Sequence, residues 1–352
     1  MRLKKSLIAL PILLGAILSG CTDKPETSKD NASTAGKDAK SHVEVNSKPG
    51  IGISVKGFHS PIAEEKFQTL IINSALQELG YDTQPILEVD YSAGYAAISQ
   101  NDIQWSAISW DPLHNDMYKN SGGDEKIIRL GTYITGAAQG YLMDKVTAEK
   151  YNIDTIDDLK DPKIAALFDT NGDGKADLTG CQPGWGCEAV INHHLKAFEL
   201  TDTVNHIQGS YAAIISDTIA RFKAGQPIVY YTWTPYWVSG VLIPNKDVVW
   251  LQVPRSEHPQ GTDTQLPNGD NYGFNVNSER IVVNKAFADA NPAAKKLFEV
   301  AKLDINAISA ENKLIAEGQN TIKDIELHTN NWIKKNRELF DSWLSAARKA
   351  AM

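Results

Sequence analysis

From residue 50 onward, short apolar runs alternate with amphipathic segments, which is the pattern of an α/β protein. The first three apolar runs expected to form strands are residues 51–55, 85–89 and 103–110. Between the first two, we expect a helix with Ser60 as N-cap, Pro61 as first helical residue and Gly80 at its end. Its apolar stripe consists of Phe67, Leu70, Ile71 and Ala75. This strand–helix–strand order predicts a largely parallel sheet.

The same alternation continues through the second half of the chain. Further strands are expected at residues 140–143, 228–233 and 279–283, and helices at residues 147–151, 156–167 and 188–200. A polar, proline-rich loop covers residues 254–271, and a helical region capped by Asn291 and Pro292 runs to the C-terminus. Because roughly 300 residues exceed what one hydrophobic core usually supports, we predict two lobes with a cleft between them. The first lobe would comprise residues 50–137 and 273–352, and the second residues 138–272.

The first 20 residues have the composition of an export signal. Three basic residues precede an apolar run that is too short and interrupted to span a bilayer. The run ends in Leu18-Ser19-Gly20-Cys21, which resembles a bacterial lipobox, so we expect Cys21 to carry lipid; an ordinary signal peptide with an incidental cysteine is the alternative. Residues 21–49 would form a polar, flexible tether. These features predict a protein anchored to a membrane on the periplasmic side of the cell envelope.

The charge of the chain argues against nucleic acid as a partner. The net charge is −8, and removal of the three basic residues of the leader makes it −11. No basic stripe remains for a phosphate backbone. With Cys21 assigned to lipid, Cys181 and Cys187 form a pair in an oxidising compartment, which favours a disulfide over zinc.

The strand at 103–110 carries the first candidate for ligand binding. Alternation puts Trp105 and Trp110 on opposite faces, and Trp110 lies at the carboxyl end, where open α/β sheets bind ligands. Asp111 and Pro112 are expected to be the N-cap and first residue of a helix. His114 would then lie in its first turn, near the positive end of the helix dipole, where a donor suits an anion. The alternative is an ordinary surface or cap histidine.

The segment CQPGWGC at 181–187 repeats this arrangement in the other lobe. Gly184 and Gly186 flank Trp185 and would let backbone amides approach a ligand. If Glu188 begins a helix, the amides of Gly186 and Cys187 lie at its N-terminus. The alternative is that Trp185 only fills a gap in the core.

The third aromatic element is YYTWTPYW at 230–237, where Tyr231 and Trp233 share one face of a strand. Trp233 lies at the carboxyl end of its strand, as Trp110 does. Aromatic faces attract a quaternary ammonium by ~2 kcal/mol each when water is excluded. Three tryptophans beside an anion site therefore suggest a zwitterionic ligand.

Five motifs, in this order and spacing, resemble the ProX family, the glycine betaine/proline betaine-binding components of ProU-type ABC importers. They are SWDPLHNDMY, GAAQGYL, DTNGDGKADLTGCQPGWGCE, YYTWTPYW and KDVVWLQVP, and the likeness extends from about residue 50 to the C-terminus. The resemblance implies a two-lobed periplasmic-binding-protein fold of type II, a monomer that delivers an osmoprotectant to a permease and its ATPase. It also implies a trimethylammonium box of Trp110, Trp185 and Trp233, and a Cys181–Cys187 disulfide. The carboxylate would be bound by His114 and the amides of Gly186 and Cys187.

One feature of the chain departs from this family. The soluble family members have no lipobox, whereas this chain carries one. The alternative function is a binding protein for choline, carnitine or ectoine, or an osmolyte sensor.

The residues argue against two other functions, a calcium site and a thiol enzyme. Asp169, Asn171, Asp173, Gly174 and Asp177 match ligand positions of a calcium loop, but Gly180 stands where the bidentate Glu belongs, so we expect no cofactor and at most a weak calcium site. A thiol enzyme would need Cys187 beside His193 or His194, and pairing with Cys181 would remove that thiol. Because the motifs of serine hydrolases, zinc proteases and P-loop enzymes are also missing, we predict a binding protein and not an enzyme.

Overall fold

The computed structural model describes residues 47–352, and these residues form one compact unit. The predicted export signal, the lipobox with Cys21 and the tether up to residue 46 lie outside the described residues. Residues 47–49, which we predicted as the end of the tether, already contact the folded body, where Arg348 Nε donates to the Ser47 carbonyl (2.9 Å). Within residues 47–352, no helix is both long enough and apolar enough to cross a bilayer.

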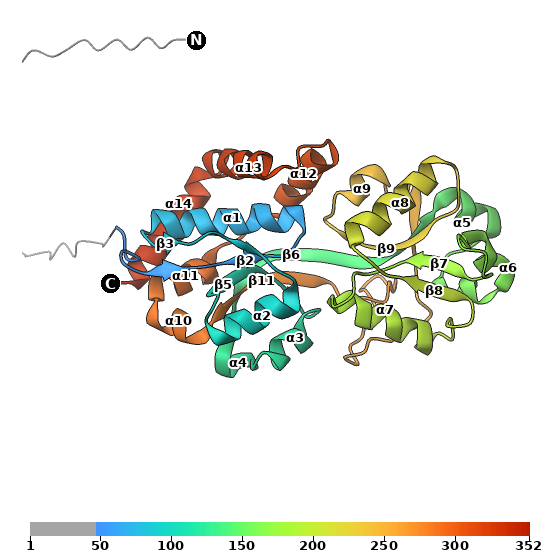
Figure 1. Ribbon diagram of the computed structural model, residues 1–352, viewed down its shortest axis with the longest axis horizontal. Helices are drawn as coiled ribbons and strands as arrows, with labels where there is room; N and C mark the ends of the chain where they lie inside the picture. The colour runs from blue at the N-terminus through green and yellow to red at the C-terminus, as the bar shows by residue number, and fades with distance from the viewer. Residues whose placement is uncertain (1–46) are drawn as a thin grey trace, which may run out of the picture. The chain divides into compact units, whose positions relative to one another are not determined.

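A seven-stranded sheet runs through both lobes, in the order β5-β11-β6-β9-β7-β8, with β10 also paired to β6. Its strands are β5 (Trp105–Asp111), β6 (Ile127–Asp144), β7 (Ala176–Thr179), β8 (Val204–Ile207), β9 (Val229–Thr234), β10 (Val248–Leu251) and β11 (Asn277–Asn284). β6 is 18 residues long and connects the lobes, since it pairs with β11 in one and with β9 and β10 in the other (Figure 1). The predicted change of lobe near residue 138 falls inside this strand.

The prediction of a largely parallel sheet is wrong. β11 is antiparallel to β5 and β6, and β6 is antiparallel to β9 and β10. The reason is that the chain crosses between the lobes on β6 and returns on β11, so the two crossing strands run in opposite directions. Among the named strands of residues 47–352, the parallel pairs are β7 with β8 and β9, and the two-residue pairs β1 (Ser54–Val55) with β3 (Asp82–Thr83) and β2 (Phe58–His59) with β4 (Leu87–Glu88).

The helices of the first lobe surround its part of the sheet, with α13 packed on α1 and α14 packed on α11. They are α1 (Ala63–Glu78), α2 (Tyr91–Gln100), α3 (Asn115–Asn120), α4 (Gly123–Lys126), α10 (Lys285–Ala290), α11 (Pro292–Val300), α12 (Ile305–Ala316), α13 (Ile322–Lys335) and α14 (Arg337–Ala350). α1 buries Phe67, Ile71 and Ala75 of the predicted stripe. It begins later than predicted, with Ile62 as N-cap, because the Ser60 hydroxyl accepts the Ile62 amide (3.2 Å) and donates to Glu65.

The first predicted strand, 51–55, is reduced to its last two residues. Gly52 lies in a turn with a φ of +82°, so the extended strand begins only at Ser54. The second predicted strand, 85–89, is likewise reduced to the exposed pair Leu87–Glu88 of β4. The strands predicted at 103–110, 140–143, 228–233 and 279–283 agree more closely, since they fall largely within β5, β6, β9 and β11 of the main sheet.

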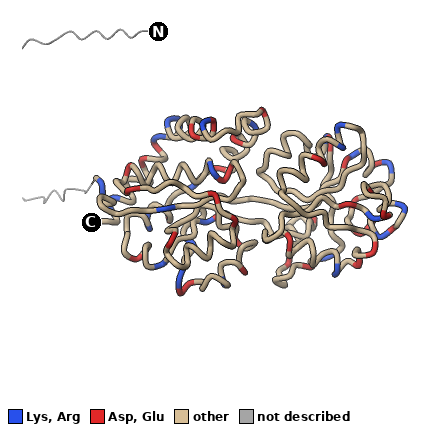
Figure 2. Tube along the Cα trace, in the orientation of Figure 1, with Lys and Arg blue, Asp and Glu red and all other residues tan. Residues whose placement is uncertain are grey.

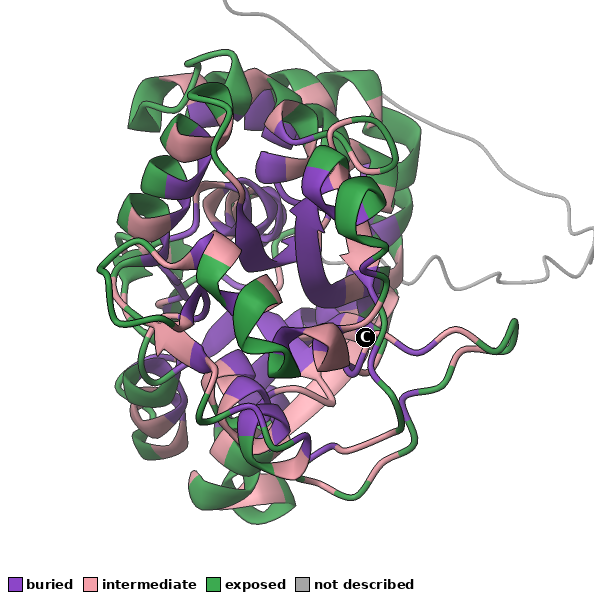
Figure 3. Cartoon of the chain, turned by 90° about the vertical axis from the view of Figure 1, so that its right-hand side faces the viewer, coloured by how far each residue is buried: buried purple, intermediate pink, exposed green. Residues whose placement is uncertain are grey.

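The second lobe has shorter helices around β7 to β10. They are α5 (Lys145–Tyr151), η1 (Ile156–Lys160), α6 (Pro162–Ala165), η2 (Ala166–Phe168), α7 (Gly186–Ala197), α8 (Tyr211–Lys223) and α9 (Val238–Val241). Figure 3 shows buried strands between helices whose outward faces are exposed. Acidic and basic residues are interspersed along the chain in both lobes (Figure 2). Most large aromatic side chains are buried, and several acidic residues, among them Glu64, Glu65 and Glu279, are buried with them.

Candidate functional site

A cavity lies between the lobes. It is lined by Ile62, Tyr91, Trp110, Leu113, His114, Gln139, Trp185, Gly186, Cys187, Tyr231 and Trp233. The six residues predicted for ligand binding are all among these. The structure therefore brings together residues from β5, the following turn, the start of α7 and β9, which together extend over more than 100 positions of the sequence.

Trp110 lines the cavity, whereas Trp105 does not. Trp105 is fully buried in the core of the first lobe, where it stacks on Phe298 with ring centroids 5.8 Å apart. The Trp110 indole N–H donates to Oε1 of Glu65 (3.0 Å), which fixes the plane of the ring. Alternation along β5 thus separates a core tryptophan from a cavity tryptophan, as predicted.

His114 reaches the cavity by a different route from the predicted one. β5 extends to Asp111 and α3 begins at Asn115, so Asp111 and Pro112 are not the start of a helix. Asp111 instead accepts hydrogen bonds from Arg129 and Arg280 (3.2 Å each), which hold it at the end of the strand. His114 is the residue that precedes the helix.

The His114 ring is buried and neutral. Burial lowers its pKa to about 3, and the nearby Arg129 acts in the same direction. Its Nδ1 accepts the backbone N–H of Trp110 (3.3 Å), so the proton of the neutral ring is on Nε2. The ring is held beside Tyr91, with centroids 4.4 Å apart. His114 can therefore offer one N–H to an anion without carrying a charge.

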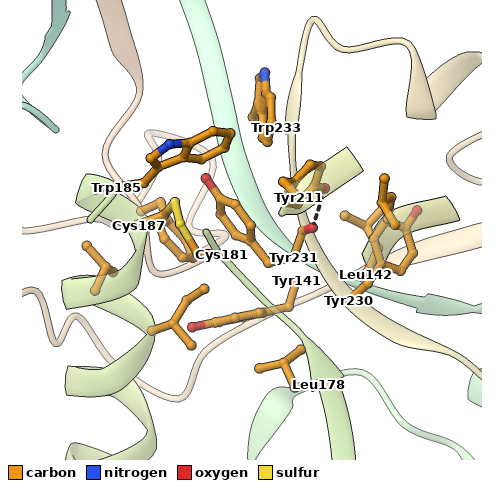
Figure 4. Packing of buried hydrophobic residues seen from close by; sticks show 14 of the residues in the cluster. Tyr141, Leu142, Leu178, Cys181, Trp185, Cys187, Tyr211, Tyr230, Tyr231 and Trp233 are labelled. Atoms are coloured by element: carbon orange, nitrogen blue, oxygen red, sulfur yellow. Dashed lines mark hydrogen bonds between the residues drawn. A yellow bond between two sulfur atoms is a disulfide. The ribbon is translucent and has the colours of Figure 1, made fainter. Parts of the chain in front are cut away.

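The loop at 181–187 forms a rigid support for Trp185. Cys181 and Cys187 are joined by a disulfide, with Cα atoms 6.0 Å apart. The Glu188 carboxylate accepts the Gly184 amide (2.7 Å), and this hydrogen bond lowers its pKa. Trp185 is 8% exposed, so it does not lie in an exposed loop as predicted. Figure 4 shows it beside Trp233, and the two rings meet edge to face at 5.8 Å.

α7 begins at Gly186, two residues before the predicted start at Glu188. The amides of Gly186 and Cys187 therefore belong to the first turn, where no carbonyl of a preceding turn can accept them. A Cβ at Gly186 would lie 2.9 Å from the Leu113 carbonyl, so only glycine allows this close approach between the lobes.

Tyr231 and Trp233 lie on the same face of β9 and line the cavity, as the alternation predicts. Trp233 is stacked on Tyr236 at 4.1 Å. Tyr211 donates its hydroxyl to the Tyr231 carbonyl (2.7 Å), a bond that Figure 4 marks. These contacts keep the Trp233 ring fixed where it borders the cavity.

Tyr91 and Gln139 were not predicted as site residues. Gln139 accepts the Tyr231 hydroxyl on Oε1 (2.6 Å), while its Nε2 has no partner within residues 47–352. In the sequence, Gln139 stands out only as a single amide side chain among the small residues of the GAAQG segment, and this polar position in an inner strand is the one local indication of a site residue. Tyr91 begins α2, and nothing in its neighbourhood distinguishes it from an ordinary core tyrosine.

The calcium-like loop is filled by its own hydrogen bonds. The Asp169 carboxylate accepts the amides of Asn171, Gly172 and Gly174, and these bonds lower its pKa. Asp177 accepts from Thr170 and Asn171, and Asp173 from Asn205. Among the described residues, no group of three or more His, Cys, Asp or Glu side chains is placed to hold a metal ion.

The residues of the thiol-enzyme alternative are engaged elsewhere. Cys187 is in the disulfide, and His194 Nδ1 forms a hydrogen bond with the Tyr141 hydroxyl (2.8 Å). His193 lies 3.4 Å from Glu257. Neither histidine activates a cysteine.

Comparison with known proteins agrees with this geometry. Residues 55–335 match the family model OpuAC, described as the substrate binding domain of ABC-type glycine betaine transport systems. The chain belongs to this family. It is 58% identical over 306 residues to the glycine betaine-binding periplasmic protein OusX of Dickeya dadantii. This alignment covers 86% of this chain and 92% of the relative. It is 55% identical over 304 residues to the glycine betaine/proline betaine-binding periplasmic protein of Escherichia coli, with the same coverage.

Solved structures show the same fold at lower identity. ProX of Borrelia burgdorferi aligns with a TM-score of 0.65 at 17% identity, over 85% of this chain and 100% of that one. An ABC-transporter choline binding protein in complex with choline aligns with a TM-score of 0.67 at 16% identity, over 85% and 96%. The OpuAC-family chain thus has the α/β fold of two-lobed periplasmic substrate-binding proteins, as its sequence predicts.

Proposed function

We propose that this chain captures glycine betaine, and the related proline betaine, for an ABC importer that supplies an osmoprotectant. The observation that carries the proposal is the convergence of Trp110, Trp185 and Trp233 on one cavity that also contains His114 and the start of α7. The names of the curated relatives support the same ligand class.

The three tryptophans suit the trimethylammonium group. A quaternary ammonium has no N–H to donate, so it is recognised by aromatic faces and not by hydrogen bonds. Each face contributes ~2 kcal/mol when water is excluded, and all three rings here are at most 8% exposed. The stacking of Trp233 on Tyr236 and the disulfide beside Trp185 hold the rings in place before the ligand arrives.

The carboxylate would be bound by the Nε2–H of His114 and the amides of Gly186 and Cys187. Hydrogen bonds to a charged group contribute roughly 1.5–3 kcal/mol each. Choline has no carboxylate and would leave these donors without a partner. The site therefore favours a betaine over choline, the principal alternative. Carnitine also has a carboxylate, but a longer chain separates it from the trimethylammonium group, and ectoine has a carboxylate but no quaternary ammonium.

We also propose how the protein works in its cellular setting. It would act as a monomer without cofactor or catalytic activity, bound through Cys21 to a membrane on the periplasmic side, and would deliver its ligand to a permease and its ATPase. The support for the anchor is the lipobox sequence, and the support for the importer is membership of the family.

A titration of intrinsic tryptophan fluorescence with glycine betaine, proline betaine, choline, carnitine and ectoine tests the ligand. We expect both betaines to bind at least about tenfold more tightly than choline, because only they engage the carboxylate donors. Equal or tighter binding of choline, or no response to any trimethylated compound, would contradict the proposal.

A further inference from the structure

A buried carboxylate lies directly behind the aromatic cavity. Glu65, in the first turn of α1, is 1% exposed. Its Oε1 accepts both the Trp110 indole N–H (3.0 Å) and the Tyr91 hydroxyl (2.6 Å), and its Oε2 accepts the Ser60 hydroxyl. Trp110 and Tyr91 both line the cavity, so the carboxylate is one hydrogen bond away from two of its rings.

The three hydrogen-bond donors around Glu65 are uncharged. A buried anion is unfavourable unless a positive charge compensates it, and hydrogen bonds supply only part of that compensation. Arg129 on β6 and Arg280 on β11 are paired with Asp111 and not with Glu65. A cation in the cavity would provide the missing charge.

We infer that Glu65 is a positioning and selectivity residue, which orients Trp110 and Tyr91 and supplies the negative charge that makes the cavity prefer a trimethylammonium ion to a neutral group of the same shape. This inference rests on the proposed function. A quaternary ammonium gains nothing from a direct hydrogen bond to a carboxylate, so the anion is best placed behind the rings. There it polarises the Trp110 N–H and the Tyr91 O–H toward itself, which makes the ring faces more negative toward the cavity.

The electrostatics of the surrounding groups agree with this role. Burial raises the pKa of Glu65 to about 7, and the hydrogen bonds from Ser60, Tyr91 and Trp110 oppose the rise. Burial also raises the pKa values of Glu64, on the same helix, and Glu279, on β11. A bound cation stabilises the ionised form of Glu65, so ligand affinity should increase as the pH rises through this range.

Two ligands that differ only in charge test the inference. Glycine betaine and 3,3-dimethylbutanoate carry the same carboxylate, but the second has a tert-butyl group in place of trimethylammonium. Glu65→Gln keeps the shape of the side chain, since the amide oxygen can accept from Trp110 and Tyr91 and the amide nitrogen can donate to Ser60. Glu78→Gln is the matched control, because Glu78 lies half-buried at the far end of α1, where it pairs with Arg337 and lines no part of the cavity.

Calorimetry with both ligands should show a selective loss. We expect Glu65→Gln to weaken glycine betaine binding by about tenfold or more and 3,3-dimethylbutanoate binding by less than about threefold, whereas Glu78→Gln changes neither. Glu65→Asp, which keeps the charge, should keep the preference ratio of the wild type even if both affinities fall. The wild-type affinity for glycine betaine should fall between about pH 8 and about pH 6, and this dependence should be smaller in Glu65→Gln.

The outcomes separate the inference from the proposed function. Equal losses for both ligands in Glu65→Gln, or an unchanged preference ratio, would overturn the role of the charge while the wild type still binds glycine betaine. A wild-type protein that binds no betaine at all would overturn the proposed function itself.

Discussion

At the residue scale, the account depends on three indole rings that three unrelated segments hold around one cavity. Trp110 is oriented by Glu65, Trp185 by the disulfide loop, and Trp233 by Tyr236. Each ring thus has a local support of its own, and Trp185 and Trp233 also meet edge to face at 5.8 Å. Single substitutions should therefore each weaken ligand binding, with non-additive effects expected for the contacting pair Trp185 and Trp233.

Substitution of each tryptophan by alanine tests the box. Trp110→Ala, Trp185→Ala and Trp233→Ala should each weaken glycine betaine binding by about tenfold or more, since one face contributes ~2 kcal/mol. Trp332→Ala, on α13 and outside the cavity, serves as the control and should bind normally. Calorimetry that finds unaltered affinity in all three cavity variants would eliminate the box.

His114→Ala should discriminate between ligands. Loss of the Nε2–H donor is expected to weaken glycine betaine binding by about tenfold and to leave choline nearly unaffected, because only the betaine has a carboxylate. An equal loss for both ligands in a fluorescence titration would contradict this assignment.

The pH dependence of binding should not come from His114. A folded-state pKa of about 3 keeps the ring neutral at every higher pH, so its donor is available throughout the neutral range. The pH profile of His114→Ala should therefore have the same shape as that of the wild type.

At the element scale, the start of α7 must approach Leu113 of the other lobe. Gly186→Ala would put a Cβ 2.9 Å from the Leu113 carbonyl and should weaken glycine betaine binding by about tenfold through overpacking. Gly240→Ala, where a Cβ meets nothing within 4 Å, is the matched control in α9. If calorimetry gives the same affinity for both variants, the close contact is not needed for ligand capture.

The loop at 169–180 is expected to act as structure and not as a calcium site. Asp169 and Asp177 already accept several hydrogen bonds from the loop itself. Thermal unfolding should give the same midpoint in excess chelator and in millimolar calcium. A clear increase with calcium would show that the ion displaces these bonds.

Elements that depend on local pattern were predictable, and those that depend on distant pairing were not. Alternation along β5 separated Trp105 from Trp110 because a strand has a period of two. The full length of β6 was missed because glycines at 131 and 136, both with positive φ, interrupt its apolar run. Its antiparallel pairing with β11, which places Ile281 opposite Leu130, has no local signal.

The same distinction applies to the candidate site. The tryptophans, His114 and the amides of α7 could be predicted because strand ends and helix starts are local features. Glu65 was not predicted, because an acidic residue in the first turn of a helix usually faces solvent and interacts with the helix dipole. Its burial follows from Tyr91 and Trp110, which are brought to it only by the fold.

At the scale of the whole molecule, the cavity is closed by contacts between the lobes. Gln182 Nε2 donates to Asp90 (3.2 Å), Trp185 meets Tyr91 edge to face at 5.8 Å, and Leu113 lies against Gly186. A ligand that engages Trp110 and His114 on one side and Trp185 and the α7 amides on the other would add to these contacts. Ligand binding and lobe closure are therefore expected to be coupled.

A crystal structure of the protein with glycine betaine is the most direct test of this account. We predict the trimethylammonium nitrogen within about 6 Å of the ring centroids of Trp110, Trp185 and Trp233. The carboxylate should accept from His114 Nε2 and from the amides of Gly186 and Cys187, at roughly 2.7–3.2 Å. Glycine betaine bound elsewhere, or indole rings that point away from the space between the lobes, would contradict the account.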